Sequence, residues 1–270
     1  MEFSIVVPVY NEAGNIRPLV AEICTALAGR DGWELLYVND GSDDGTRGEL
    51  YQAQADYPGL RVLQHSQRSG QSSALLTGVR AARAPWIITL DGDGQNDPAD
   101  IPLLIDRLAM ENAASTGIML AGHRTRRRDS LLKRLSSRVA NAVRSRLLKD
   151  ATPDTGCGLK LFPRALFLAL PAFDHMHRFL PALMQRQGAH VLSVPVQHRS
   201  RQRGVSKYGV HNRLWVGLVD MAGVMWLQHR RLGRGAAPDG WCAQICDGFG
   251  VSWLQHRPCV VNAKEESLDV

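Results

Sequence analysis

The chain has 270 residues, 44% of them hydrophobic and 21% charged, an ordinary balance for a folded globular protein that excludes a disordered or fibrous one. This length buries a full core, and we expect one large domain. The net charge of +6 is concentrated between Arg124 and Lys149, where ten Lys or Arg residues stand against a single acid, Asp129. The concentration favours an anionic partner (phosphate, a membrane surface or nucleic acid) or a solvated helix face.

The N-terminus and the cysteines narrow the class further. The chain begins with an apolar, strand-like run and has no basic segment or long apolar stretch there, so we expect no signal peptide. Five scattered cysteines favour reduced thiols in a cytoplasmic setting and have no paired spacing for a zinc site. They are Cys24, Cys157, Cys242, Cys246 and Cys259. A run of about twenty apolar residues, which a membrane-spanning helix requires, is absent from the sequence.

In the first half of the chain, short β-rich runs alternate with segments whose apolar residues recur at helical spacing. We expect strands at 3–9, 33–38, 60–64, 86–90 and 117–122. We expect helices at 15–28, 44–57 and 72–82. Near-continuous apolar strands separated by helices predict an α/β fold, in which a mostly parallel central sheet carries helices on both faces. Ligands of such sheets bind at the carboxyl ends of the strands.

Two later segments have the pattern of surface helices. In residues 130–149 the apolar residues fall on one helical face, with Lys and Arg around them. This pattern predicts a basic amphipathic helix, which either lies on an anionic membrane or packs on the core with its basic face outward. Residues 214–227 are the longest apolar run, but Asp220 interrupts them. We therefore expect this run in the membrane interface or in a core, and not across a membrane.

Polar clusters follow the predicted strands, at the sheet edge where ligands bind. They are 8–12 (Pro-Val-Tyr-Asn-Glu), 39–46 (Asn-Asp-Gly-Ser-Asp-Asp-Gly-Thr), 70–72 (Gly-Gln-Ser) and 91–95 (Asp-Gly-Asp-Gly-Gln). Turn formation and helix capping account well for Asp43 and Asp44. They account less well for Asp40, which directly ends the second strand.

Asp91 and Asp93 are the sharpest local signal. Two carboxylates two residues apart, just past a strand, can share one divalent cation, and Gln95 is placed to assist. Mg²⁺ and Mn²⁺ prefer oxygen ligands and keep positions open for water and substrate phosphates. Such a metal would neutralise a diphosphate and stabilise it as a leaving group. An Asp-x-Asp pattern alone is common, but its place beside two other acidic strand ends favours the metal site.

Four ordered motifs resemble the signatures of glycosyltransferase family 2, and within it the dolichyl-phosphate mannosyltransferase-like and undecaprenyl-phosphate sugar transferases. They are 8–12, 39–42, 91–95 and 204–208 (Gly-Val-Ser-Lys-Tyr). The resemblance implies the GT-A (Rossmann-like) fold of nucleotide-diphospho-sugar transferases over residues 1–213. We expect an amphipathic, membrane-associated segment over 214–233. Many members continue into membrane spans, whereas residues 234–270 are polar, and we expect an atypical, disordered tail there.

The resemblance also assigns roles to residues on the donor side. The nucleotide would be held by Pro8, Tyr10, Glu12 and Asp40. The divalent cation, Mg²⁺ or Mn²⁺, and the donor diphosphate would be bound by Asp91, Asp93 and Gln95, with Asp93 counted as catalytic. Arg201 and Lys207 match a mobile loop that closes over the donor phosphates, where their charges offset the negative charge that develops there. Without the resemblance, residues 199–203 would be interpreted as a solvated basic loop.

On the acceptor side, the resemblance assigns Arg124, Asp154 and Arg178. Arg124 would face the acceptor or donor phosphate in a catalytic role. Asp154 would be a general base or a residue of the acceptor site, although a phosphate acceptor is already a charged nucleophile and needs little base. Arg178 would pair with the acceptor phosphate as a planar cation, or else be a surface arginine.

The sequence therefore predicts an inverting, metal-dependent hexosyltransferase at the cytoplasmic face of a membrane. Its donor would be a GDP-mannose or UDP-glucose type of nucleotide sugar, and its acceptor a polyprenyl phosphate. One alternative is a family 2 enzyme that acts on a polysaccharide, a protein or a lipid-linked glycan. Another is a non-catalytic nucleotide or nucleic-acid binding module. Because the chain has no basic patch interleaved with aromatic residues and no nucleic-acid motif, we expect no nucleic-acid partner.

Overall fold

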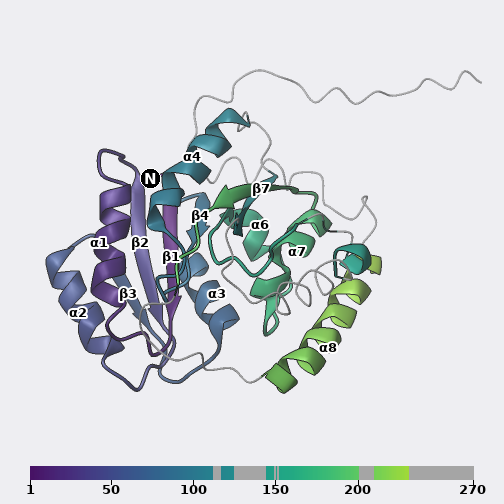
Figure 1. Cartoon of the computed structure of the whole chain (residues 1–270), viewed down its shortest axis with the longest axis horizontal. Coiled ribbons are helices and arrows are strands. Elements are labelled where there is room, and N and C mark those ends of the chain that lie inside the picture. The colour runs from purple at the N-terminus through teal and green to yellow at the C-terminus, as the bar shows by residue number, and fades with distance from the viewer. Residues whose placement is uncertain (112–116, 125–143, 149, 151, 201–209, 231–270) are drawn as a thin grey trace, which may run out of the picture. The chain divides into compact units, whose positions relative to one another are not determined.

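The computed structural model describes residues 1–111, 117–124, 144–148, 150, 152–200 and 210–230, without the side chains of 210–216 (Figure 1). Residues Met1–His229 form one compact unit. It contains a seven-stranded sheet in the order β3-β2-β1-β4-β6-β5-β7. The strands are β1 (Phe3–Val9), β2 (Trp33–Asn39), β3 (Leu60–Gln64), β4 (Trp86–Thr89), β5 (Ile118–Arg124), β6 (Lys160–Pro163) and β7 (His190–Val196). All neighbours run parallel except β6, which is antiparallel to both β4 and β5. The predicted fold class is confirmed.

Helices cover both faces of the sheet (Figure 1). They are α1 (Ile16–Ala26), α2 (Thr46–Asp56), α3 (Gln71–Ala81), α4 (Ile101–Met110), α6 (Arg164–Leu168), α7 (Leu180–Arg186) and α8 (Val210–His229), with short 3-10 helices η1 (Pro98–Asp100) and η2 (Met176–Phe179). One core includes buried residues of α1, α2 and α4. The other includes buried residues of α3, α6, α7 and α8. Val6 and Val7 of β1 enter different cores, as the alternation of side chains along a strand requires.

The predicted strands and helices of the first half of the chain agree with the structure to within two residues at each end. Two strands, β6 and β7, were not predicted. β6 has only four residues and begins with a lysine, so it offers no apolar run of usual length. Along β7, the exposed residues His190, Ser193 and Pro195 interrupt the apolar ones, which weakens the strand pattern.

Several predictions fall at the edges of what the structure describes. The predicted basic helix at 130–149 lies outside the described residues except for 144–148, which are helical. The predicted boundary at residue 213 falls inside α8, and α8 belongs to the compact unit. The predicted tail at 234–270 lies outside the described residues. No helix in the described part of the chain is long and apolar enough to cross a membrane.

The direction of β6 decides which residues reach the carboxyl edge of the sheet. Because β6 runs against its neighbours, its first residue, Lys160, pairs with Thr89 at the end of β4 and with Ala121 of β5. The residues that lead into β6 therefore arrive at the edge where the parallel strands end. Thr89 Oγ1 donates a hydrogen bond of 2.6 Å to the carbonyl of Gly158, which fixes this segment against β4.

Helix α3 lies very close to β1 at Gly78. A Cβ atom at this position would overlap Val6 Cγ1 and lie 3.1 Å from Val38 Cγ2. Both valines are fully buried, so neither has space to move away. The start of α3 contributes to the candidate site below, and Gly78 therefore helps to set the height of that helix over the sheet.

Gly78→Ala is expected to lower the free energy of unfolding by about 1–3 kcal/mol, because the added methyl group overpacks the interface of α3 and β1. The control is Gly223→Ala in α8, where an added Cβ meets nothing within 4 Å. There the better helix propensity of alanine leaves stability unchanged or slightly higher. Urea unfolding followed by circular dichroism measures both, and equal stability of the two variants would contradict this packing.

Candidate active site

A cleft of about 990 Å³ lies at the carboxyl edge of the sheet, a volume typical of small-molecule binding sites. Its lining comes from the ends of β1, β4 and β5, the start of α3, the segment before β6, η2 and α8. Five residues predicted for the site lie together in it, namely Pro8, Asp91, Arg124, Asp154 and Arg178. The cleft thus collects residues that are more than 160 positions apart in the sequence, as Pro8 and Arg178 show.

Asp91 lines the cleft, and together with Asp93, whose charge acts on it, it makes up the acidic side of the site. Burial of Asp91 and the nearby charge of Asp93 raise the pKa of Asp91 to about 6, while Lys160 and Arg124 act in the opposite direction. Gln71 Nε2, at the start of α3, donates a hydrogen bond of 3.0 Å to Asp91 Oδ1. Asp93 Oδ1 accepts from the backbone N–H of Gln95 at 3.1 Å. The two carboxylates are therefore close enough to repel each other.

Gly158 leaves room for the carboxylate of Asp91. Thr89 pairs with Lys160 in the antiparallel register, so two residues further along, Gly158 stands opposite Asp91. A Cβ at Gly158 would overlap the carboxylate carbon and both carboxylate oxygens of Asp91. Any other residue at 158 would therefore have to displace the Asp91 side chain.

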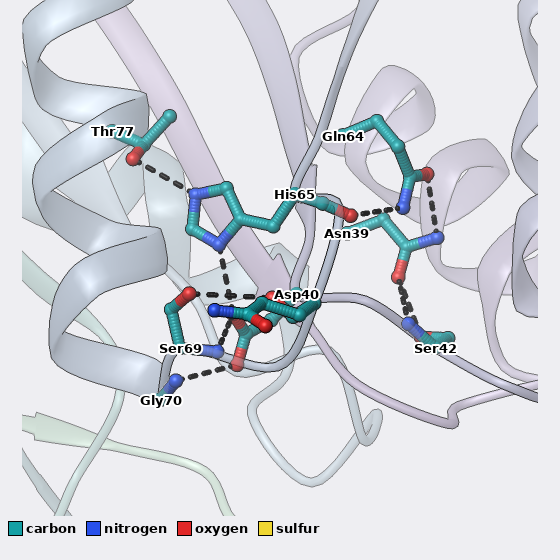
Figure 2. Close-up of polar contacts among 9 residues, drawn as sticks. Asn39, Asp40, Ser42, Gln64, His65, Ser69, Gly70 and Thr77 are labelled. Atoms are coloured by element: carbon teal, nitrogen blue, oxygen red, sulfur yellow. Dashed lines mark hydrogen bonds and ion pairs between the residues drawn. The ribbon is translucent and has the colours of Figure 1, made fainter.

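Asp40 is buried at the end of β2 and holds the start of α3 (Figure 2). Its oxygens accept from the backbone N–H groups of Ser69 and Gly70, both at 2.8 Å. His65 Nδ1 lies 2.8 Å from Asp40 Oδ1, and His65 Nε2 lies 2.9 Å from Thr77 Oγ1. A carboxylate at a helix N-terminus satisfies free N–H groups and complements the helix dipole. The structure thus gives Asp40 an internal role beside the predicted one in nucleotide binding.

The first two predicted motifs are joined to each other. Asn11, with a left-handed φ of 52°, donates from its backbone N–H to Ser42 Oγ at 2.9 Å. Asp44 accepts from the backbone N–H groups of Thr46 and Ala13, at 2.9 and 3.2 Å. Asp44 therefore serves the turn at the start of α2, as the capping interpretation predicts. Arg68 lies over the ring of Tyr10, with its guanidinium carbon 4.5 Å from the ring centroid.

Arg124 and Asp154 pair with each other. Arg124 Nε and Nη2 donate to the two carboxylate oxygens of Asp154, at 2.6 and 2.8 Å. Asp154 is buried, and its hydrogen bonds and charge raise the pKa of Arg124 against the effect of desolvation. This two-pronged arrangement is the strong geometry for an arginine and a carboxylate. Asp154 thereby fixes the plane of the Arg124 guanidinium at the cleft.

Arg178 lies in η2 next to His177, and both line the cleft. Ser72 Oγ lies 2.8 Å from His177 Nδ1, which connects η2 with the first turn of α3. Burial, together with the charges of Arg178, Lys160 and His175, lowers the pKa of His177 to about 3. The imidazole is therefore neutral at pH 7, and Arg178 supplies the charge of η2.

The remaining predicted residues lie beside the cleft or outside the described chain. The backbone carbonyl of Gln95 accepts from Arg199 N–H at 2.9 Å, and Arg199 forms ion pairs with Glu22 and Asp97 at 2.5 and 2.6 Å. Glu12 Oε2 accepts from Asn15 Nδ2 at 2.8 Å. Arg201 and Lys207 lie outside the described residues. In the part of the chain that the structure describes, no group of three or more His, Cys, Asp or Glu side chains is placed to hold a metal ion.

Comparison with known proteins identifies the family. Residues 4–170 match the family described as Glycosyl transferase family 2. The chain belongs to glycosyl transferase family 2. The resemblance that the four motifs predict is confirmed, and with it the class of enzyme.

Within the family, the most similar proteins include polyprenyl-phosphate sugar transferases. A dodecaprenyl-phosphate galacturonate synthase of Rhizobium johnstonii is 34% identical over 235 residues, which cover 84% of this chain and 67% of that protein. An undecaprenyl-phosphate 4-deoxy-4-formamido-L-arabinose transferase of Pseudomonas paraeruginosa is 35% identical over 210 residues, which cover 76% of this chain and 60% of that protein. The chain thus spans only part of the length of each relative.

Solved structures with the same fold include two glycosyltransferases with bound nucleotides. Glucosyl-3-phosphoglycerate synthase from Mycobacterium tuberculosis, in complex with Mg²⁺ and UDP, has a TM-score of 0.62 at 19% identity and covers 82% of this chain and 79% of that chain. A mannosyltransferase from Pyrobaculum calidifontis, in complex with GDP-Man and Mn²⁺, has a TM-score of 0.59 at 23% identity, over 86% and 65%. These likenesses confirm the GT-A fold.

Sequence reasoning missed three residues in the cleft of this family 2 protein, namely Lys160, His177 and Gly158. Lys160 and Gly158 lie at the start of an antiparallel strand, whereas the motif search followed the ends of parallel ones. Cys157-Gly158-Leu159-Lys160 was available as a signal, because a lysine beginning a buried apolar run is unusual. His177 stood next to the predicted Arg178, but only the fold brings it to Ser72.

His177 makes the stability of this protein sensitive to acid. The folded protein holds the imidazole neutral down to a pKa of about 3, whereas the unfolded chain takes up a proton near the usual 6.5. Stability is therefore complete above pH 6.5 and falls as the pH drops, by up to about 1.4 kcal/mol per pH unit. In His177→Gln this part of the loss disappears. Urea unfolding at pH 7, 6 and 5 measures this pH dependence of stability. The control is His190→Gln, which changes an exposed histidine of β7. Parallel pH dependences for His177→Gln and wild type would contradict the assignment.

Proposed function

We propose that this family 2 protein transfers a sugar from a nucleoside diphosphate sugar to a polyprenyl phosphate, with inversion at the anomeric carbon. The observation that carries the proposal is the division of charge within one cleft. Asp91 lines the cleft with the charge of Asp93 acting on it, and the cations Arg124 and Arg178 line the same cleft. A metal-bound diphosphate suits the carboxylates and an anionic acceptor suits the arginines. The names of the relatives support a lipid phosphate as that acceptor.

The acidic side fits a divalent cation. Burial and, after it, repulsion by Asp93 raise the pKa of Asp91, and a cation between the two carboxylates would offset both effects. Mg²⁺ and Mn²⁺ are bound in such enzymes through one or two carboxylates, with water and substrate phosphates as the other ligands. Asp91 and Asp93 supply that number, and Gln95 stands next to them. When bound, the cation would offset the charge that develops on the leaving diphosphate. The complexes of the structural neighbours with Mg²⁺ or Mn²⁺ support this choice of ion.

On the donor side, the nucleoside would lie along the ends of β1 and β2. Pro8, Tyr10, Glu12 and Asp40 remain the proposed contacts. Among the contacts of the described residues given above, Asp40 Oδ2 accepts one hydrogen bond, from Gly70 N–H. This oxygen can therefore accept a further hydrogen bond from an N–H group of a base. Arg201 and Lys207 are proposed to approach the donor phosphates. Whether the base is uracil or guanine is a question for the assay.

On the acceptor side, we assign the phosphate to Arg124 and Arg178. The pairing with Asp154 keeps the Arg124 guanidinium oriented, and its Nη1 is the donor nitrogen that Asp154 does not use. A phosphate oxygen is already charged at neutral pH and can attack the anomeric carbon directly from the face opposite the diphosphate. Asp154 is thus proposed to position Arg124, with no proton transfer required of it.

The lipid chain would leave the cleft along α8. Leu218 both lines the cleft and is exposed, and Val219 and Trp226 are exposed further along the same helix. Exposed large apolar side chains next to a binding cleft are typical of lipid or membrane contact. We therefore propose that α8 rests on the membrane surface on the cytoplasmic side. The basic segment 130–149 is proposed to add attraction to anionic lipid headgroups.

The function is tested by transfer assays with radiolabelled UDP- and GDP-sugars, a short polyprenyl phosphate, and Mg²⁺ or Mn²⁺. Label is expected in an organic-soluble lipid-phosphate sugar with inverted anomeric configuration, and EDTA is expected to abolish it. Asp93→Asn should lower turnover by about 100-fold or more, since it removes a charged metal ligand. The control, Asp56→Asn, changes an exposed carboxylate of α2 that pairs with Arg17 at the surface. Absence of transfer from every nucleotide sugar would sink the proposal, and transfer to a glycan or protein instead would replace the acceptor.

Gly158→Ala is expected to weaken Mn²⁺ binding by about 10- to 100-fold, because its Cβ displaces the Asp91 carboxylate. Electron paramagnetic resonance of free Mn²⁺ measures the affinity in the presence of UDP or GDP. Gly156→Ala in the same segment is the matched control for Mn²⁺ affinity, since its Cβ meets Arg124 Nη2 at 3.1 Å and a carboxylate oxygen of Asp154 at 3.6 Å, but no atom of Asp91 within 4 Å. Unchanged Mn²⁺ affinity in a folded Gly158→Ala protein would remove Asp91 from the metal site.

A further inference from the structure

Lys160 places a buried ammonium group at the base of the cleft. The residue is 5% exposed and lines the cleft, although it belongs to the central strand β6. In β6, Lys160 and Phe162 share a face, and Phe162 lies in the core beneath α3 and α7. The lysine side chain therefore extends on the side of the sheet where η2 and the start of α3 form the cleft.

The ammonium of Lys160 has fewer hydrogen-bond and ion-pair partners than the buried arginines near it. Within the described residues, Nζ donates one hydrogen bond, to the carbonyl of Cys157, and no carboxylate lies within ion-pair distance. An ammonium has three N–H groups. The two neighbouring buried arginines differ, since Arg124 is paired with Asp154 and Arg144 with Asp150. Lys160 thus keeps donors that the described residues do not satisfy.

The charge of Lys160 acts on both sides of the cleft. It opposes the rise in the pKa of Asp91 on the acidic side, and it contributes to the lowered pKa of His177 in η2. Burial lowers the pKa of Lys160 itself, while the charges of Asp91 and Asp154 act against that effect. The ammonium therefore acts electrostatically on Asp91, on the predicted donor side, and on His177, next to Arg178 of the predicted acceptor side.

A purely structural role does not account for this residue. Burying an ammonium without a paired anion is unfavourable, and a well-packed apolar side chain of similar volume in its place is often neutral or stabilising. A buried cation in a cleft is more readily explained if an anionic ligand completes its hydrogen bonds. Both substrates of the proposed reaction carry phosphate oxygens.

We propose that Lys160 contacts a phosphate oxygen of a substrate at the base of the cleft. The inference rests on the proposed function, and it adds a substrate-binding cation from the start of β6. Two phosphates qualify. The diphosphate of the donor would approach from Asp91, and the phosphate of the acceptor would approach from Arg178. In either case the remaining N–H groups of Lys160 are satisfied by the ligand.

The test compares wild type with Lys160→Met, which keeps the length of the side chain and removes its charge. Turnover is expected to fall by about 100-fold, as when a single charged donor to a developing anion is lost. The melting temperature is expected to stay the same or to rise. Lys160→Gln, which retains N–H donors without charge, is a second variant, and its turnover should lie between those of wild type and Lys160→Met. The control is Arg61→Met, which removes from β3 a cation that pairs with Glu34 of β2 and does not line the cleft.

Two arms of the experiment identify the phosphate. If the ammonium binds the donor, Lys160→Met weakens calorimetric binding of UDP or GDP in EDTA, where the metal takes no part. If it binds the acceptor, that affinity is unchanged and the KM for a short polyprenyl phosphate rises. A folded Lys160→Met protein with wild-type turnover, wild-type nucleotide affinity and wild-type acceptor KM would overturn the inference.

A measurement on the wild-type protein covers the case in which neither variant folds. The ε-carbon NMR signal of Lys160 should shift when UDP, GDP or the short polyprenyl phosphate is added, and no shift with any of them would overturn the inference. The proposed function fails separately. If the wild-type protein transfers no sugar but Lys160→Met binds the nucleotide more weakly than wild type, the proposed function is contradicted and the phosphate contact is supported.

Discussion

The antiparallel insertion of β6 between β4 and β5 is the constraint on which the cleft depends. Parallel strands deliver their last residues to one edge of the sheet, and Asp91 and Arg124 arrive there in that way. β6 delivers its first residues to the same edge, so Asp154, Gly158 and Lys160 meet them from the opposite chain direction. If β6 ran parallel to β4, these three residues would lie at the opposite edge of the sheet.

The electrostatic balance of the cleft follows from this meeting. The carboxylates of Asp91 and Asp93 repel each other, and the ammonium of Lys160 partly offsets that repulsion. Asp154 is used by Arg124 and adds little free negative charge. In the proposed function this site is completed by ligands of both signs, a divalent cation at the carboxylates and phosphate oxygens at the cations. Each ligand reduces the cost of burying the groups that bind it.

The sequence was informative where local pattern and fold agree. Near-continuous apolar runs predicted the first strands, and the polar residues at their ends predicted Pro8 and Asp91 in the cleft. It was uninformative where contacts depend on distant partners. The pairing of Arg124 with Asp154 joins two segments thirty positions apart, and nothing in either segment specifies a bidentate geometry. The antiparallel direction of β6 likewise has no local signature, because a four-residue strand has the same alternation in either direction.

Asp40 has a structural role that a functional experiment must separate from its proposed role in nucleotide binding. Its carboxylate holds the N–H groups of Ser69 and Gly70 at the start of α3 and, through His65, the hydroxyl of Thr77 about two turns further along that helix. The same helix begins with Gln71, which contacts Asp91. Asp40→Ala would therefore loosen a wall of the cleft as well as remove the proposed contact to the nucleotide. Loss of activity in such a protein, taken alone, would report on the architecture of the helix as much as on recognition of the base.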